Sequence, residues 1–233
     1  MARPIDVGPY HLDAARVEEL EAALYRDHPP VTLPPEYAEW TKENLLRFLI
    51  RLARYKFVAR MLREKDRVLE VGSGSGLGAI FLAQHAAHVT GLEVRQHEHD
   101  EATELNRREN VEFVCEDFHD HSPSQPYDAV VALDVIEHLD DAGARALLAR
   151  MRDVAAPTGM VVIGTPSFFS WEHQSEVSRA SHVHCYRQEE LLALMDEYFG
   201  RTLPFSMNDE LVHTGHPTMA WYYFALAFCP RTT

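Results

Sequence analysis

The stretch Arg67-Val68-Leu69-Glu70-Val71-Gly72-Ser73-Gly74-Ser75-Gly76-Leu77-Gly78-Ala79-Ile80 combines three local signals. A short apolar run contains an acid near its end, glycines then alternate with other residues, and apolar residues at helical spacing follow. Glycine is favoured where the backbone takes a positive φ, or where a ligand must approach the main chain without a Cβ in the way. The free N–H groups of a helix N-terminus come directly afterwards. The stretch therefore predicts a strand, a tight turn and a helix that together bind a nucleotide-type ligand in an open α/β sheet.

The spacing within this stretch indicates which ligand is bound. A dinucleotide fingerprint reads G-x-G-x-x-G and places a pyrophosphate on the helix N-terminus. Here Gly72, Gly74 and Gly76 alternate, and Glu70 lies two residues before the first of them. A carboxylate repels a pyrophosphate but attracts a cation. The loop resembles motif I of the class I S-adenosylmethionine-dependent methyltransferases, which implies that Glu70 lies near the amino and sulfonium end of the cofactor and that the glycines let it lie flat on the turn. Alone, such a loop is also compatible with a purely structural βα turn.

The bulk composition limits the function classes. A chain of 233 residues with 46% hydrophobic residues suits one α/β domain with an N-terminal extension. The formal charge of −14, from 36 acids against 22 bases, argues against general nucleic-acid binding, which needs a basic surface. Cys115, Cys185 and Cys229 lie far apart, which favours a reducing, cytoplasmic location. No segment reaches the roughly 18 apolar residues of a membrane span, so no membrane insertion is expected.

The segments after the glycine loop alternate between strand-like and helix-like patterns. Strands are expected at residues 87–93, 111–115, 126–133, 160–164, 201–207 and 221–228. Alternation of this kind implies a parallel sheet with right-handed crossovers. Together with the family resemblance, it predicts an α/β fold with a Rossmann-like seven-stranded sheet, mostly parallel with an antiparallel last strand, and helices on both faces.

Residues 1–54 are expected to form a helical extension or lid, and residues 55–233 the methyltransferase domain. A helix capped by Asp13 is followed by a proline-rich loop and by one long helix over residues 36–63. Arg47, Arg51 and Tyr55 share a face of that long helix with Asn44. This face is either solvated or lies across the mouth of the cofactor or substrate site.

Further cofactor contacts are expected at the ends of the next strands. Glu93 ends the second strand roughly 20 residues after the glycine loop, where a carboxylate can accept two hydrogen bonds from a ribose diol. The methyltransferase resemblance implies that Asp117 binds the adenine amino group and that Phe118 packs on the ring. It also places Leu133 and Asp134, at the end of the fourth strand, among the cofactor-binding residues.

Methyl transfer from a sulfonium is an in-line displacement, so the protein must position the acceptor and help to remove a hydroxyl proton. His138, just past the fourth strand, is the first candidate for the base because an imidazole titrates near neutrality. The alternative is that it caps a helix or binds a loop. His182, in the long connection 165–186, and His213, in the segment 208–217, are further catalytic candidates.

A metal site competes with this interpretation. Asp134, Glu137 and His138 are spaced i, i+3, i+4, and His182 could add a ligand from the long connection. This mix of oxygen and nitrogen ligands suits Mg²⁺, Mn²⁺ or a similar divalent ion. The pattern is similar to the D/E-x-x-E-H plus distal His metal site of the small-RNA 2′-O-methyltransferases, and the resemblance implies an ion that lowers the pKa of the acceptor hydroxyl. The same E-H-L run also occurs in family members without a metal.

The methyltransferase resemblance covers roughly residues 55–228 and looks closest to the small-molecule O-methyltransferases, such as those of ubiquinone biosynthesis and of sugar or natural-product pathways. We therefore expect a cytoplasmic S-adenosylmethionine-dependent enzyme that methylates a hydroxyl of a small polar metabolite (a sugar, a natural product or a phenol), with a homodimer as a compatible assembly. Three alternatives stay open. Methylation of an RNA 3′ end is disfavoured by the negative charge. An NAD-type oxidoreductase is disfavoured by the glycine spacing and Glu70, and a non-catalytic binding module by the intact loop with Glu93 and Asp117.

Overall fold

The computed structural model describes residues 13–28 and 30–231. The chain divides into two compact units, residues 1–33 and residues 34–233. In the first unit, α1 (Ala14–Asp27) begins at the predicted cap, because the Asp13 side chain accepts a hydrogen bond from the backbone N–H of Arg16 at 3.0 Å. All of the site residues discussed below belong to the second unit.

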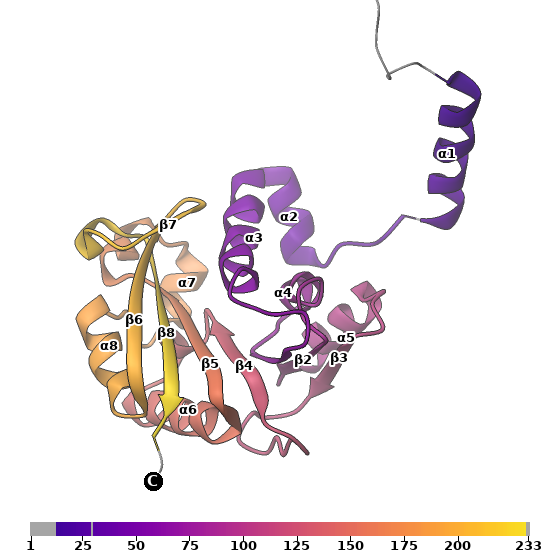
Figure 1. Ribbon diagram of the computed structural model, residues 1–233. Coiled ribbons are helices and arrows are strands. Elements are labelled where there is room, and N and C mark those ends of the chain that lie inside the picture. Colours follow the sequence, from indigo (N-terminus) through magenta and orange to yellow (C-terminus); the bar gives the residue numbers. More distant parts are fainter. Residues whose placement is uncertain (1–12, 29, 232–233) are drawn as a thin grey trace, which may run out of the picture. The chain divides into compact units, whose positions relative to one another are not determined.

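The second unit is built on a mixed sheet with the strand order β3-β2-β1-β4-β5-β8-β6-β7 (Figure 1). Its strands are β1 (Arg67–Val71), β2 (His88–Glu93), β3 (Val111–Cys115), β4 (Tyr127–Leu133), β5 (Ala155–Pro166), β6 (Phe199–Asn208), β7 (Leu211–His213) and β8 (Tyr222–Pro230). Strands β1 to β5 are parallel, and β8 lies antiparallel between β5 and β6. The predicted Rossmann-like sheet with an antiparallel last strand is confirmed. The short β7 is an additional edge strand, which pairs with the end of β6 in a segment that was expected to be a loop.

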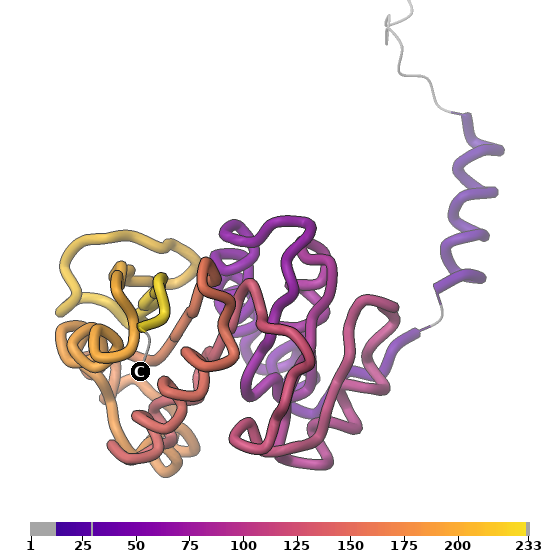
Figure 2. The backbone as a smooth tube through the Cα atoms, turned by 60° about the horizontal axis from the view of Figure 1, so that its bottom comes forward, coloured from indigo at the N-terminus to yellow at the C-terminus, as the bar shows by residue number. Residues whose placement is uncertain are grey.

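Helices cover both faces of this sheet, as predicted. The helices α3 (Leu45–Ala59) and α4 (Leu77–Leu82) pack on one face, and α6 (Asp141–Val154) and α8 (Gln188–Asp196) on the other (Figure 2). The alternating side chains of each strand supply both cores, because successive residues of a strand point to opposite faces. In β4, Val130 and Ala132 enter one core while Ala129 and Val131 enter the other. Over the described ranges, none of the helices is both long and apolar enough to cross a membrane.

The single long helix predicted over residues 36–63 is wrong. The chain forms α2 (Pro35–Glu43) and α3 instead, separated by Asn44, whose φ of −159° and ψ of 81° are not helical. An aromatic cluster explains the break, because the ring of Tyr37 in α2 packs 5.8 Å from that of Phe48 in α3. Apolar periodicity continues through both helices, so it gives no sign of the turn. The predicted domain boundary between residues 54 and 55 falls inside α3, which packs on the sheet.

The remaining helical elements lie in several of the connections between strands. The 3₁₀ helix η1 (Ile136–His138) follows β4, and η2 (Phe168–His173) follows β5. The helices α5 (Gln96–Leu105) and α7 (Glu176–Ser181) follow β2 and η2, and η3 (Pro217–Met219) precedes β8. Because parallel strands place their carboxyl ends at one edge of the sheet, the loops after β1, β2, β3, β4 and β5 all start at the same edge.

Candidate active site

The glycine loop between β1 and α4 has the backbone that its sequence predicts. Gly72, Gly74 and Gly76 have φ values of 71°, 53° and 85°, a region that residues with a side chain rarely adopt. A Cβ on Gly76 would lie 2.6 Å from Ala102 in α5 and equally close to the ring of Phe113 in β3. The loop therefore needs glycine at this position both for its conformation and for its close packing.

Glu70 is a buried acid beneath this loop, with 1% of its surface exposed. No described residue donates a well-aligned hydrogen bond to either carboxylate oxygen, although the Tyr55 hydroxyl and the Arg51 charge lie near them. Burial raises the pKa of Glu70 to about 7, against the opposing effects of the Tyr55 hydroxyl and the Arg51 charge. The site also depends on Gly78, since a Cβ there would lie 2.2 Å from the Tyr55 ring and 2.5 Å from Glu70 Oε1. A buried carboxylate with free lone pairs fits the binding of a cationic group.

Glu93, at the end of β2, is tied to the glycine loop. Its Oε2 accepts from the backbone N–H of Gly74 at 3.0 Å, and its Oε1 accepts from the backbone N–H and the Nε of Arg95 at 3.0 and 3.2 Å. A ribose diol would therefore share a carboxylate that already fixes the loop. Glu93 thus couples the loop to any ribose bound at this edge of the sheet.

Three of the four remaining predicted cofactor residues, Asp117, Phe118 and Leu133, have different surroundings. Asp117 is exposed, and its Oδ1 accepts from the backbone N–H of His119 at 2.8 Å, which leaves Oδ2 available. Phe118 is 7% exposed and belongs to the core on the α6 face, so only a small part of its ring is accessible. Leu133 is buried in the opposite core, at the end of β4.

Asp134 holds an ion-pair network at the end of β4. Its Oδ2 accepts from Arg54 Nη1 at 2.6 Å and from Arg51 Nη1 at 3.3 Å, both in α3. Burial alone would raise the pKa of Asp134, but the charges of Arg54 and then Arg51 outweigh it and lower the pKa below its ordinary value. Arg51 lies on the helix face that was expected either to be solvated or to lie across the cofactor or substrate mouth, and it pairs with Asp134 instead, whereas Arg54 was not considered. Arg54 lies about one turn before Val58 and Ala59, which are buried at the end of α3. This position next to the core was the available sign that Arg54 is paired.

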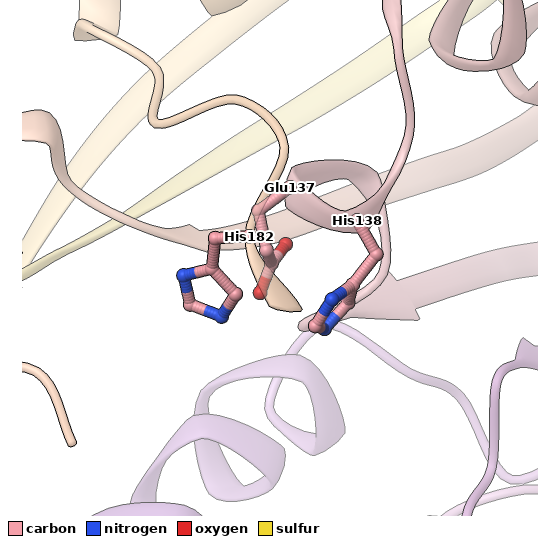
Figure 3. A group of neighbouring side chains, drawn as sticks. All are labelled: Glu137, His138 and His182. Atoms are coloured by element: carbon pink, nitrogen blue, oxygen red, sulfur yellow. The ribbon is translucent and has the colours of Figure 1, made fainter. Parts of the chain in front are cut away.

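The structure brings Glu137, His138 and His182 together (Figure 3). Each offers one ligand atom, and these atoms all lie within 4.8 Å of one another. The two imidazole rings are 4.9 Å apart, edge to face. The long connection is fixed on η1, because the backbone N–H groups of Val183 and His184 donate to the Glu137 carbonyl at 2.8 and 3.0 Å. This contact brings His182 next to a residue 45 positions earlier in the chain.

Electrostatics in this cluster favour a ligand with positive charge. Burial, and then the charge of Asp134, raises the pKa of Glu137 to about 8. Its Oε2 accepts from the Thr165 hydroxyl at 2.9 Å, while Oε1 is buried and bonded to no described residue. Burial, and then the nearby His138, lowers the pKa of His182. His182 Nδ1 is likewise buried and unpaired among residues 13–28 and 30–231.

This donor set fits a divalent metal ion. His138 Nδ1 lies 3.0 Å from the Ser181 carbonyl, a contact that assigns the proton to Nδ1 and leaves Nε2 free to bind. With Asp134 paired to two arginines, two imidazoles and one carboxylate remain, which suit Mn²⁺, Zn²⁺ or Fe²⁺ better than Mg²⁺. His213 in β7 does not belong to this group and instead lies 3.2 Å from Asn208 Oδ1.

Relatives in sequence cover part of this chain. The ubiquinone biosynthesis O-methyltransferase of Bradyrhizobium diazoefficiens is 29% identical over 102 residues, which are 42% of this chain and 39% of that protein. The enzyme of the same description from Coxiella burnetii is 30% identical over 97 residues, 40% of this chain and 42% of its own length. The chain thus spans about two fifths of the length of the curated relatives it matches.

Solved structures share the fold. The N-methyltransferase NodS from Bradyrhizobium japonicum, in complex with S-adenosylhomocysteine, superposes with a TM-score of 0.60 at 18% identity, covering 78% of this chain and 88% of that one. The methyltransferase domain of bacterial CtHen1 also gives 0.60, at 16% identity, over 77% of this chain and 99% of that one. A family model described as a methyltransferase domain matches residues 37–198, which include the glycine loop, Glu93 and the Glu137–His138 pair. The chain therefore belongs to this methyltransferase-domain family, and it shares its fold with S-adenosylmethionine-dependent methyltransferases.

Proposed function

We propose that this enzyme transfers the methyl group to a hydroxyl oxygen of a small molecule, and that Glu137, His138 and His182 hold a divalent metal ion at the acceptor side. The observation that carries the proposal is the grouping of these three ligand atoms within 4.8 Å, with Glu137 Oε1 and His182 Nδ1 bonded to no described residue. The partial similarity to the ubiquinone O-methyltransferases supports oxygen as the accepting atom.

Residues of the first three strand ends would hold the donor. Glu70 offers a carboxylate with free lone pairs to the cofactor amino group, and Glu93 offers lone pairs to the ribose hydroxyls. Asp117 Oδ2 is available for the adenine amino group, and Phe118 presents a ring edge beside it. S-adenosylmethionine supplies an activated methyl group, so the acceptor oxygen needs a position in line with it and the loss of a proton.

The acceptor side supplies that deprotonation. A divalent ion at Glu137, His138 and His182 would lower the pKa of a bound hydroxyl by Lewis acidity. Thr165 orients Glu137 through the hydrogen bond to Oε2, and the Ser181 carbonyl orients His138. Without an ion, His138 Nε2 is the group that can take the hydroxyl proton, since Nδ1 is engaged. A metal-assisted mechanism and a mechanism with His138 as the base differ in one result. Chelation of the metal stops turnover only in the first.

The same grouping supports a second candidate, 2′-O-methylation of an RNA 3′ end, because such enzymes carry the D/E-x-x-E-H plus distal His pattern that this chain resembles. The formal charge of −14 favours a small acceptor, because binding to a polyanion draws on basic side chains. Asp134, which would complete the four-residue pattern, is instead paired with Arg51 and Arg54.

The test is methyl transfer from radiolabelled S-adenosylmethionine to hydroxylated acceptors, with and without EDTA and added Mn²⁺. A panel of phenols, catechols, monosaccharides and a short oligoribonucleotide separates the two candidates. We expect a methyl ether on a small acceptor, activity that EDTA removes and Mn²⁺ restores, and a loss of about 100-fold or more in Glu137→Gln. Glu176→Gln, which changes an exposed acid in α7, serves as the matched control.

Several results would reject parts of this proposal. Methylation of the oligoribonucleotide alone would favour the second candidate. Full activity in EDTA, together with its loss in His138→Ala, would replace the metal by a histidine base. Methylation on nitrogen or carbon of every accepted compound would reject the hydroxyl acceptor altogether.

A further inference from the structure

A cavity of about 560 Å³ lies beside the candidate metal cluster, between η2 and the segment that carries His182. Its walls are Phe168, Phe169, Trp171, Glu172, His182, Val183, His184 and Cys185. Small-molecule sites have volumes of roughly 300–1,000 Å³ and apolar or aromatic walls with a few polar groups. His182 belongs both to this wall and to the group formed with Glu137 and His138.

The aromatic wall is exposed although its backbone is fixed. Phe168 and Trp171 are 43% and 39% exposed. The Phe168 N–H donates to the Tyr186 carbonyl at 2.8 Å, and the Arg187 guanidinium stacks 4.1 Å above the Phe168 ring centroid. Exposed aromatic side chains on an anchored backbone lose little conformational entropy when a ligand covers them, and such patches mark binding sites.

We infer that the part of the acceptor that does not react is a flat aromatic ring, which is seated against Phe168, Phe169 and Trp171 with its hydroxyl directed to His182 and its neighbours. Aromatic walls favour a planar π-system through offset-stacked or edge-to-face contacts. A sugar needs more hydrogen-bonding groups than Glu172, His182 and His184 provide. The inference rests on the proposed O-methyltransferase function, and it selects the phenolic class from the acceptors considered above.

Binding by calorimetry, in the presence of saturating S-adenosylhomocysteine, tests the inference without turnover. The probes are catechol, cis-cyclohexane-1,2-diol as a saturated diol of similar size, and adenosine. We expect catechol to bind at least tenfold more tightly than the saturated diol, and Trp171→Ala to weaken catechol about tenfold while Trp171→Phe retains most of the affinity. Tyr25→Ala removes an exposed aromatic side chain of α1, outside the cavity wall, and should leave catechol affinity unchanged.

Equal affinity for catechol and the saturated diol would overturn the inference, as would a Trp171→Ala variant that still binds S-adenosylhomocysteine and keeps full catechol affinity. Tighter binding of adenosine than of catechol would overturn it in favour of a nucleoside acceptor. If Trp171→Ala does not fold, the comparison of the probes on the wild-type protein decides. Calorimetry with S-adenosylhomocysteine alone tests cofactor binding, and titration with Mn²⁺ tests the metal site. A failure of the proposed function would appear in one of these two titrations, whereas a failure of the aromatic pocket would appear only in the catechol titration.

Discussion

The proposed donor side and the proposed acceptor side of this protein are constructed differently. On the proposed donor side, the glycine loop, Glu70 and Glu93 lie within 24 residues of one another, and three glycines with positive φ form the turn between them. On the acceptor side, Glu137 and His182 are 45 residues apart and meet only because two N–H groups of the long connection donate to the Glu137 carbonyl. The first site is specified by local geometry, whereas the second depends on a tertiary contact.

This comparison predicts that a substitution on the donor side leaves metal binding intact, and that a substitution on the acceptor side leaves cofactor binding intact.

The largest expected effect concerns Glu70. Its pKa is near 7 in the folded chain against 4.5 without burial. Between pH 4.5 and 7, the folded state therefore binds more protons at Glu70 than the unfolded state does. The contribution of protonated Glu70 to the unfolding free energy is fully present below pH 4.5 and is lost as the pH rises through 7. The unfolding free energy of the wild type, relative to Glu70→Gln, should fall by about 3 kcal/mol across this window.

Urea denaturation of the cofactor-free proteins at several pH values measures this difference. Equal pH slopes for both proteins would contradict the prediction. Cofactor binding should release a proton near pH 7, because the bound amino group favours the charged carboxylate. Calorimetry in buffers of different ionisation enthalpy detects that proton, whereas the metal affinity of Glu70→Gln should match that of the wild type.

The second effect concerns His182→Ala, which removes a ligand contributed by the long connection. We expect Mn²⁺ affinity to fall by about 100-fold, or roughly 2.7 kcal/mol, while S-adenosylhomocysteine affinity stays within about twofold. His97→Ala removes an exposed histidine of α5 and is the matched control in the same titration. Unchanged Mn²⁺ affinity in His182→Ala would reject the three-residue site.

The third effect concerns Gly78, where a substitution tests close packing around the residue. Gly78→Ala would force a Cβ against the Tyr55 ring and Glu70, and we expect a loss of about 2 kcal/mol in unfolding free energy. Gly215→Ala is the control, because no atom of the described structure lies within 4 Å of the added Cβ, and its effect should stay within about 0.5 kcal/mol. Thermal or urea unfolding measures both, and equal stability of the two variants would show that the space around Gly78 adapts.

The smallest effect is expected for metal binding by Asp134→Asn. Because Asp134 is already paired with Arg51 and Arg54, the substitution should change Mn²⁺ affinity by less than about threefold, although it lowers stability by leaving two partly buried arginines unpaired. Calorimetric titration with Mn²⁺ checks this. A loss of Mn²⁺ affinity comparable with that of His182→Ala would show that Asp134 is a metal ligand. The donor side and the acceptor side would then share a residue at the end of β4.

Much of the fold could be predicted from the sequence because its signals are local. Gly72, Gly74 and Gly76 indicate positive φ, and the alternation of strand and helix patterns indicates the parallel sheet. The break at Asn44 could not be predicted, because apolar spacing is the same in one helix or in two that fold back through aromatic contacts. The strand β7 escaped prediction for a related reason, since an edge strand of three residues is stabilised by its partner and not by its own pattern.

The sequence by itself determined the proposed donor side, because a glycine loop after a buried strand has few conformations and because Glu70 and Glu93 lie near the ends of the strands β1 and β2. The sequence also named Glu137, His138 and His182 as candidate ligands on the proposed acceptor side, but only the tertiary structure shows that they lie together. Spacing placed Asp134 in the same group, whereas the fold pairs Asp134 with two arginines of α3. The physical reason is that charge pairing and the position of a long connection depend on which distant segments the sheet brings together. The local sequence pattern does not specify these contacts.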